Sequence, residues 1–250
     1  LSTSEDTLGR FQAAGWDVMA VDGHDADALD KAMAWAKTRA RPSLIACKTV
    51  IGYGAPGKAG SAASHGSPLG AAEIEAARAA YGWQLPPFTV PGNLLDAWRA
   101  IGRQGEKSYE QWSARLEALP AQTRQDFIRR WQGELPPAWT EAMTALKAAI
   151  LASPKPVATR KASGNVLDAL APHLRELAGG SADLTGSNNT LAKGMTPVAK
   201  GSFAGRYIHY GVREHAMAAM MNGMAVHKGL IPYGGTFLVF SDYCKPAIRL

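Results

Sequence analysis

The sequence predicts an α/β protein made of parts of two parallel sheets, with a helical segment between them. Residues 16–50 follow the order strand, helix, strand, and residues 207–240 repeat that order. A helix that connects two neighbouring strands over this length makes the pair parallel, with a right-handed crossover. Residues 86–153 instead form helical runs that prolines interrupt. We therefore expect two α/β parts joined by a helical linker.

Composition and length agree with a globular chain. The 250 residues are 46% hydrophobic and 19% charged, an ordinary composition for one large domain or two modest ones. No apolar run approaches the roughly 20 residues of a transmembrane helix, and no signal peptide opens the chain, so no membrane partner is expected. Cys47 and Cys244 lie far apart without a CxxC motif, which suits a reducing cytoplasm.

The net charge of +6 is spread along the chain. Arg124, Arg129 and Arg130 are the nearest approach to a cluster, and their spacing predicts a solvated helix face. No basic patch is interleaved with aromatic residues, so nucleic acid is not an expected partner. Phosphorylated small molecules account for the basic charge equally well.

The first α/β part has a regular order of elements. We expect a helix at 3–14, a strand at 16–21, a turn at 22–25, a helix at 27–39 and a strand at 43–50. Two parallel strands do not make a stable sheet alone, so further strands are expected from a longer protein. Leu1 is not a start residue, and Leu250 stops inside an amphipathic helix without a terminating residue, which favours an internal fragment.

The loop after these strands carries glycines in two familiar arrangements. Gly52, Gly54 and Gly57 match GxGxxG, and the stretch from Gly52 to Lys58 matches the start of a GxxxxGK phosphate loop. The dinucleotide fingerprint needs a helix here, but Pro56 and a Gly/Ser-rich loop follow. The phosphate loop needs Ser or Thr after the lysine, and this chain has Ala. Neither function is therefore expected.

The remaining elements follow in order along the chain. We expect a helix at 71–81, helical runs at 86–153, a short helix capped by Ser163 and limited by Pro172, a strand at 207–210, a helix at 213–226, a strand at 235–240 and a last helix capped by Ser241. Four tryptophans of the helical runs are expected to anchor them to the main body: Trp98, Trp112, Trp131 and Trp139. Four methionines are expected on one apolar face of the 213–226 helix: Met217, Met220, Met221 and Met224.

Glu214 is the candidate reactive residue of the last α/β part. It falls in the first turn of a helix whose other face is apolar, so its carboxylate could lie in a site of low dielectric constant. From the spacing alone the plainer interpretation is favoured: Glu214 complements the helix dipole and pairs with Arg213 or His215.

Several words of the sequence resemble one family. RYIHYGVREHAM at 206–217, PYGGTF at 232–237 and LVFSDY at 238–243 closely resemble the start of the pyrimidine-binding domain of transketolases, which use thiamine diphosphate. ATRKAS at 158–163, GGSADLTGSNNT at 179–190 and the KTVIGYG and SHGSPLG words within 48–70 are also similar to that family. The resemblance implies parts of two parallel-sheet thiamine diphosphate-binding domains joined by a helical linker.

The resemblance also implies roles for individual residues. Glu214 would hydrogen-bond a ring nitrogen of the cofactor's aminopyrimidine, and His65 would lie near both the diphosphate and the donor sugar. Cofactor contacts are further implied for Phe237, Phe240, Tyr243 and Asp183, although the two phenylalanines also suit a plain strand core and Asp183 also suits a structural role. Arg160 and Ser187 would bind the phosphate of the sugar, since an Arg fork with a hydroxyl donor suits an oxyanion. The alternative for His65, as for any single histidine in a loop, is a surface residue without a function.

The implied domains are residues 1–85 from the diphosphate-binding domain, 86–158 as helical interdomain segment and linker, and 159–250 from the pyrimidine-binding domain. The family's Gly-Asp-Gly motif and its asparagine do not occur here, so ligands for Mg²⁺ or Ca²⁺ are expected outside this chain. The implied activity moves a two-carbon ketol unit between sugar phosphates of the xylulose 5-phosphate and ribose 5-phosphate class, in a cytoplasmic homodimer of the pentose phosphate pathway. Dihydroxyacetone synthase activity and a non-catalytic binding or assembly module are the alternatives.

Overall fold

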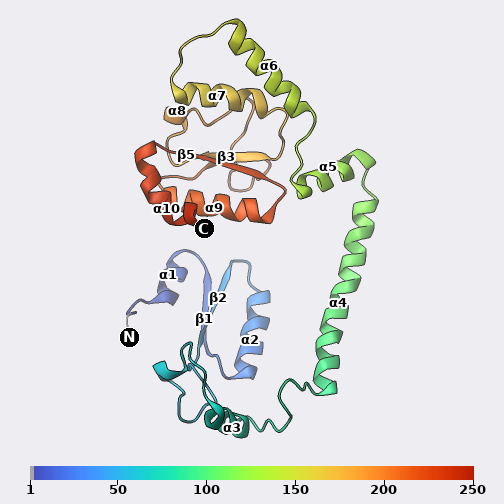
Figure 1. Ribbon diagram of the computed structural model, residues 1–250, viewed down its shortest axis with the longest axis vertical. Helices are drawn as coiled ribbons and strands as arrows, with labels where there is room; N and C mark the ends of the chain where they lie inside the picture. Colours follow the sequence, from blue (N-terminus) through green and yellow to red (C-terminus); the bar gives the residue numbers. More distant parts are fainter. Residues whose placement is uncertain (1–2) are drawn as a thin grey trace. The chain divides into compact units, whose positions relative to one another are not determined.

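The computed structural model describes residues 3–250, and the chain divides into two compact units, Leu1–Ile101 and Gly102–Leu250. Figure 1 labels the elements of both units. The first unit contains α1 (Thr7–Ala13), β1 (Asp17–Asp22), α2 (Ala26–Lys37), β2 (Ser43–Lys48), the 3₁₀ helix η1 (Ala62–Ser64) and α3 (Ala71–Ala80). Helix α4 (Gly92–Glu117) crosses the sequence position that divides the units.

Parallel pairing organises the first unit. Strands β1 and β2 pair in parallel from Asp17 opposite Ser43 to Asp22 opposite Lys48. Helix α2 connects them, and Figure 1 shows α1 and α2 flanking the two strands. Asp25 begins α2 by accepting a hydrogen bond from the Ala28 amide at 3.0 Å. The predicted strand–helix–strand order is confirmed for this unit.

The first helix is shorter than the sequence predicted. It begins at Thr7, not at residue 3, because Asp6 caps it: the Asp6 carboxylate accepts a hydrogen bond from the Gly9 amide at 2.9 Å. The strand β2 ends at Lys48, two residues before the predicted end, because its partner β1 ends opposite at Asp22.

The second unit is built on a three-stranded parallel sheet. It contains α5 (Ala121–Gln132), α6 (Ala138–Ala152), α7 (Thr159–Leu170), β3 (Leu177–Ser181), α8 (Thr185–Asn188), β4 (Tyr207–His209), α9 (Glu214–His227), β5 (Ile231–Gly235), the 3₁₀ helix η2 (Leu238–Phe240) and α10 (Ser241–Arg249). The strand order is β4-β3-β5, so β3 lies in the centre, with all five residues buried. In Figure 1, α7 lies on one side of this sheet and α9 and α10 lie on the other. The α/β class with parallel sheets is confirmed.

The central strand was not predicted, because glycines weaken a strand pattern. Strand β3 reads LAGGS, and two of its residues need to be glycine for the neighbouring strands to approach. A Cβ atom on Gly180 would lie 1.7 Å from the Ile208 carbonyl oxygen of β4, and one on Gly179 would lie 2.0 Å from the Tyr233 carbonyl oxygen of β5. Only glycine fits between these two backbones.

The predicted strand at 235–240 is wrong. Strand β5 runs from Ile231 to Gly235, opposite Leu177 to Ser181 of β3. It ends where its partner ends, and the chain then turns into η2. The two phenylalanines of PYGGTFLVF therefore lie beyond the sheet and are not strand core.

Two helices of this unit differ in detail from the expectation. Ser163 does not cap a helix, because α7 begins four residues earlier at Thr159, although it ends before Pro172 as predicted. In α9, Met217 is buried, and Met221 and Met224 pack beside it. Met220 does not share this face and is 54% exposed.

The helical segment is attached to the second unit at fewer points than its tryptophans suggested. Trp139 packs against the core cluster of α7 and β3, and Trp131 meets the His227 ring edge-on at 5.7 Å. Trp98 is 73% exposed, and Trp112 stacks on Tyr109 and meets the Phe127 ring at a tilt of 58°. None of the helices within residues 3–250 is long and apolar enough to cross a membrane.

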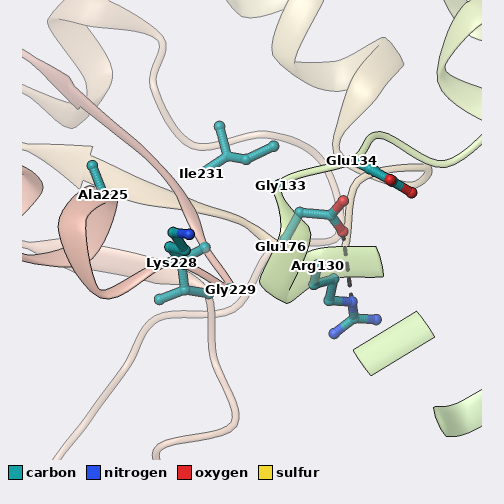
Figure 2. Close-up of a pocket in the computed structure, with 9 residues that line it drawn as sticks. Arg130, Gly133, Glu134, Glu176, Ala225, Lys228, Gly229 and Ile231 are labelled. Carbon is teal, nitrogen blue, oxygen red and sulfur yellow. Dashed lines mark ion pairs between the residues drawn. The ribbon is translucent and has the colours of Figure 1, made fainter. Parts of the chain in front are cut away.

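A buried ion pair attaches α5 instead, and it corrects the prediction of a solvated arginine face. Glu176 is 3% exposed, and the Arg129 guanidinium donates to both of its oxygens, at 2.7 and 3.3 Å. The Arg130 Nε atom lies 3.8 Å from the same carboxylate. A dashed line marks this ion pair in Figure 2. Asp126 accepts from both arginines, and the hydrogen bond from Arg129 contributes most to lowering the pKa of that carboxyl. The arginines face the protein because a buried carboxylate needs compensating charge.

Removal of Glu176 is expected to destabilise the second unit. Glu176→Ala leaves Arg129 mostly buried with only the partly exposed Asp126 as a charged partner, so the free energy of unfolding should fall by about 3 kcal/mol or more. Lys245→Ala is the matched control, since its pair with Asp242 is exposed and should be worth less than about 1 kcal/mol. Urea unfolding followed by circular dichroism measures both, and equal losses would contradict the assigned role.

Candidate functional site

The predicted site residues of the second unit lie where its parallel strands end. The chain leaves β3 into α8, which carries Ser187; it leaves β4 into α9, which begins at Glu214; and it leaves β5 into the loop that carries Phe237. Carboxyl ends of parallel strands lie at one edge of the sheet, where α/β proteins bind their ligands.

A cavity of about 550 Å³ brings three of the predicted residues together. Its lining includes Arg160 from the first turn of α7, Ser187 from α8 and Phe237 from the loop after β5. Arg160 and Ser187 are both exposed, so a ligand can reach the guanidinium and the hydroxyl. Arg and Ser side chains that line one cavity supply the kind of hydrogen-bond donors that suit an oxyanion such as phosphate.

The cavity also contains polar residues that the sequence analysis missed. Asn188 and Thr190 line it beside Ser187, and Thr236 lines it after β5. The Nδ2 atom of Asn188 is buried and has no hydrogen-bond partner within residues 3–250. The only signal in the sequence was the run of amide and hydroxyl residues in SNNT, next to the predicted serine.

A buried serine joins two loops of the site. Ser181, the last residue of β3, is completely buried. Its hydroxyl donates to the Gly235 carbonyl at 3.0 Å and accepts from the Leu184 amide at 3.1 Å. The end of β5 and the entry to α8 are therefore held together. Phe237 and Ser187, which follow these two points in the chain, both line the cavity.

Glu214 is buried, with 8% of its surface exposed, and it is the first residue of α9. The Thr236 hydroxyl donates to its Oε1 atom at 3.3 Å. Among residues 3–250, Glu214 forms no ion pair with Arg213 or His215, and the Arg213 guanidinium donates to the Tyr210 carbonyl instead. The predicted pairing with these neighbours is therefore wrong, while the position at the helix N-terminus suits a carboxylate.

Helix α10 is tied to Glu214 from the other side. The Cys244 thiol is buried and donates to the Glu214 carbonyl oxygen at 3.4 Å. Burial, and next the charge of Glu214, raise the pKa of that thiol, so it stays protonated and can donate. Cys244 therefore acts as a small core residue that fixes the start of α9.

Three aromatic residues form a row after β5. The ring centroids of Phe237 and Phe240 lie 5.9 Å apart in a stacked arrangement, and those of Phe240 and Tyr243 lie 6.2 Å apart. Phe237 is 41% exposed and Tyr243 is 63% exposed. Large exposed aromatic faces offer a stacking surface for a flat heterocycle, and Phe237 directly follows Thr236, the partner of Glu214.

Asp183 does not line the cavity. It is exposed, directly after the buried Ala182, and its φ of 60° lies in the left-handed region. Asp tolerates that conformation better than most residues, so a structural role in the turn out of β3 accounts for this residue type.

His65 belongs to the first unit, where it is exposed at the end of η1. Its loop is held by the Lys58 ammonium, which donates to the Leu69 carbonyl at 2.8 Å, and by Glu73, which accepts from the Gly57 amide at 2.7 Å. No helix opens at the glycines of the GxGxxG match; turns follow as far as η1. The loop predicted at these glycines is confirmed.

The residues of the second unit fit the aminopyrimidine end of thiamine diphosphate. The Glu214 carboxylate has a single side-chain hydrogen bond within residues 3–250, so it keeps acceptor capacity. Its partner Thr236 is followed directly by Phe237, the first residue of the aromatic row. The described residues contain no group of three or more His, Cys, Asp or Glu side chains that could hold a metal ion.

Comparisons with known proteins agree with this arrangement. A family described as the thiamine diphosphate binding domain of transketolase matches residues 1–136, and one described as its pyrimidine binding domain matches residues 155–250. A transketolase of Cereibacter sphaeroides is 51% identical over 251 residues, covering 100% of this chain and 38% of the relative. A plasmid-encoded transketolase of Cupriavidus necator is 52% identical, covering 99% of this chain and 37% of the relative. The structure of a transketolase from Leishmania mexicana superposes with a TM-score of 0.84 at 35% identity, covering 99% of this chain and 37% of the other.

The two parallel-sheet units and these matches define an α/β protein of the class that binds thiamine diphosphate. The chain belongs to the transketolase family. It spans 37–38% of the length of the relatives described above.

The hydrogen bond between Thr236 and Glu214 is expected to stabilise the second unit. Thr236→Val removes the hydroxyl and leaves a buried carboxylate oxygen without its partner, so the free energy of unfolding should fall by about 1–2 kcal/mol. Thr236→Ser keeps the hydroxyl and should lose less than half of that. Chemical unfolding of the two variants measures the difference, and identical values would show that the hydrogen bond is not the cause.

Proposed function

We propose that the protein is an enzyme that transfers a two-carbon ketol unit from a ketose phosphate to an aldose phosphate with thiamine diphosphate. The observation that carries the proposal is the shared cavity, in which the oxyanion donors of Arg160 and Ser187 lie with Thr236, the partner of the buried Glu214. Phosphate recognition and a dry carboxyl group are the two demands that such a reaction makes on this part of the protein.

The proposed substrates are sugar phosphates of the xylulose 5-phosphate and ribose 5-phosphate class. The hydrogen-bond donors that line the cavity support this proposal. Solved structures of transketolase from Pichia stipitis hold xylulose 5-phosphate, fructose 6-phosphate and sedoheptulose 7-phosphate. Their common feature is a terminal phosphate on a polyhydroxylated chain. Arg160 would bind two oxygens of that phosphate through its planar fork, and Ser187 would donate to a third.

Glu214 would hold a proton shared with a ring nitrogen of the cofactor's aminopyrimidine, as the resemblance implies. When bound, thiamine diphosphate supplies the carbanion chemistry for breaking and forming carbon–carbon bonds. Phe237, Phe240 and Tyr243 would pack against the flat ring and exclude water from the carboxyl group.

His65 and Asp183 complete the proposed set. His65 would donate a hydrogen bond to the cofactor's diphosphate and to the donor sugar, since an imidazole can serve either acceptor. Asp183 would lie near the cofactor after β3. Support for both roles is the match of their surrounding sequence words to the family.

The family supports the wider parts of the proposal. These are a cytoplasmic homodimer of the pentose phosphate pathway, and Mg²⁺ or Ca²⁺ beside the cofactor's diphosphate, with ligands outside residues 1–250. The proposed division assigns 1–85 to the diphosphate-binding domain, 86–158 to the interdomain segment and 159–250 to the pyrimidine-binding domain.

Arg160→Ala, in the protein at its full natural length, should raise the KM for phosphorylated sugars about tenfold or more. The loss of a charge-assisted hydrogen bond to phosphate costs about 1.5–3 kcal/mol. Steady-state kinetics with phosphorylated and unphosphorylated donors measures the effect, and only the phosphorylated donor should suffer. Lys161→Ala is the matched control, because it removes the adjacent exposed cation, which does not line this cavity. Equal losses for both donors, or for both variants, would exclude the phosphate role.

Glu214→Gln should lower kcat by about 10²–10⁴-fold, since the amide keeps the shape of the side chain but cannot exchange the proton. Glu214→Ala should be at least as slow. Deuterium exchange at the reactive carbon of bound cofactor isolates this step from the sugar chemistry. If Glu214 only stabilises the helix N-terminus, its replacement should lower the free energy of unfolding by about 1 kcal/mol and leave that exchange unchanged. Wild-type exchange in a folded, cofactor-loaded Glu214→Gln protein would refute the role.

A further inference from the structure

Tyr207 is the largest side chain of the second unit that is completely buried. It is the first residue of β4, paired with Gly179 of the central strand. Its hydroxyl donates to the Thr185 hydroxyl at 2.7 Å and lies 2.8 Å from the Thr190 hydroxyl. A phenol has one hydrogen to donate, so Thr190 donates to Tyr207 and Tyr207 donates to Thr185. One buried oxygen therefore connects two threonines that are five positions apart in sequence.

Those threonines enclose the segment that carries Ser187, one of the two proposed oxyanion donors of the cavity. Ser187 and Asn188 line the cavity from this segment, whose only regular element is the four-residue helix α8. The backbone closes the segment loosely, because the Thr190 amide lies 3.4 Å from the Thr185 carbonyl. Asn189, just before Thr190, has a left-handed φ of 54°. The Tyr233 hydroxyl also donates to the Thr190 carbonyl at 2.8 Å, but the Tyr207 hydroxyl is the group whose hydrogen bonds reach the threonine side chains at both ends of the segment.

We propose that Tyr207 is a positioning residue for phosphate recognition: its buried hydroxyl fixes both ends of the segment 185–190, so that Ser187 stays in the lining of the cavity that Arg160 also lines. The inference rests on the proposed function. Tyr207 is completely buried, does not line the cavity and acts through Thr185 and Thr190. The expected consequence of losing the hydroxyl is weaker binding of phosphate, with the cofactor side of the site unaffected.

A second tyrosine separates this role from simple burial. Tyr210 is 5% exposed and lies three residues after Tyr207, but its buried hydroxyl has no hydrogen-bond partner within residues 3–250. Tyr207→Phe and Tyr210→Phe delete the same atom from two buried rings. Only the first deletion breaks a hydrogen-bonded connection.

The test uses the protein at its full natural length and compares these two variants with Arg160→Ala and Ser187→Ala. Titration calorimetry with inorganic phosphate and steady-state kinetics with phosphorylated and unphosphorylated donors provide the measurements. Tyr207→Phe should weaken phosphate binding and raise the KM of the phosphorylated donor about five- to tenfold, as expected for one or two lost hydrogen bonds. The KM of the unphosphorylated donor, kcat and the Kd for thiamine diphosphate should stay within about twofold. Tyr210→Phe should match the wild type in every measurement.

A conservative pair at the other end of the bond tests the same connection. Thr185 lies outside the cavity lining. Thr185→Val should reproduce the Tyr207→Phe phenotype, and Thr185→Ser should restore phosphate binding. If Tyr207→Phe does not fold, this pair decides the question.

The inference is overturned if Tyr207→Phe and Tyr210→Phe have the same affinity for phosphate, or if Tyr207→Phe affects both kinds of donor equally. Loss of phosphate binding in Arg160→Ala and Ser187→Ala together with no change in Tyr207→Phe would overturn the positioning role alone. Unchanged phosphate binding in all four variants would overturn the phosphate site itself, and with it the proposed function.

Discussion

The second unit depends on the close approach of three strands, which two adjacent glycines in the central strand make possible. A Cβ atom at Gly179 or Gly180 would come within about bonding distance of a neighbouring carbonyl oxygen, so the sheet exists only because both residues are glycine. The consequence reaches the candidate site. Because β4 and β5 are held against β3, the loops that leave the three strands share one edge of the sheet. Ser187, Glu214 and Thr236 each follow a different strand, and the distances between them depend on that packing.

Buried polar groups then give those loops a defined position. Ser181 connects the end of β5 to the entry of α8, and Tyr207 connects the two ends of the segment that carries Ser187. Further from the site, Glu176 fixes α5 through Arg129. Each of these groups is buried with its hydrogen bonds satisfied, and each would be costly to leave without its partner. Loops rich in glycine and small polar residues have little intrinsic preference for one conformation, so such connections supply the order that apolar packing does not.

Prediction from the sequence succeeded where a local pattern has one interpretation. It failed where residues distant in the sequence set the bounds of a strand or the environment of a side chain. The order strand, helix, strand predicted parallel pairing in the first unit, and the apolar positions of 213–226 predicted α9 with Glu214 in its first turn. Strand β3 was missed because its glycines are chosen for the approach of other strands, not for strand propensity. The strand predicted at 235–240 failed for a related reason: β5 can extend only as far as β3 provides a partner. The arginine face of α5 was predicted to be solvated, but Arg129 and Arg130 face the buried Glu176, which lies more than 40 positions further along the chain.

The sequence by itself determined the α/β class, the parallel connections and the resemblance to the transketolase family, because periodicity and sequence words are properties of consecutive residues. Only the tertiary structure decided that Arg160 and Ser187 share a cavity of about 550 Å³, that Thr236 donates to Glu214, and that the hydroxyl of Tyr207 bridges two threonines. The members of each pair lie 17 to 27 positions apart in the sequence. The directions of their side chains depend on how three strands and their loops pack. A local pattern does not encode these directions, because each depends on residues that are close in space but distant in the sequence.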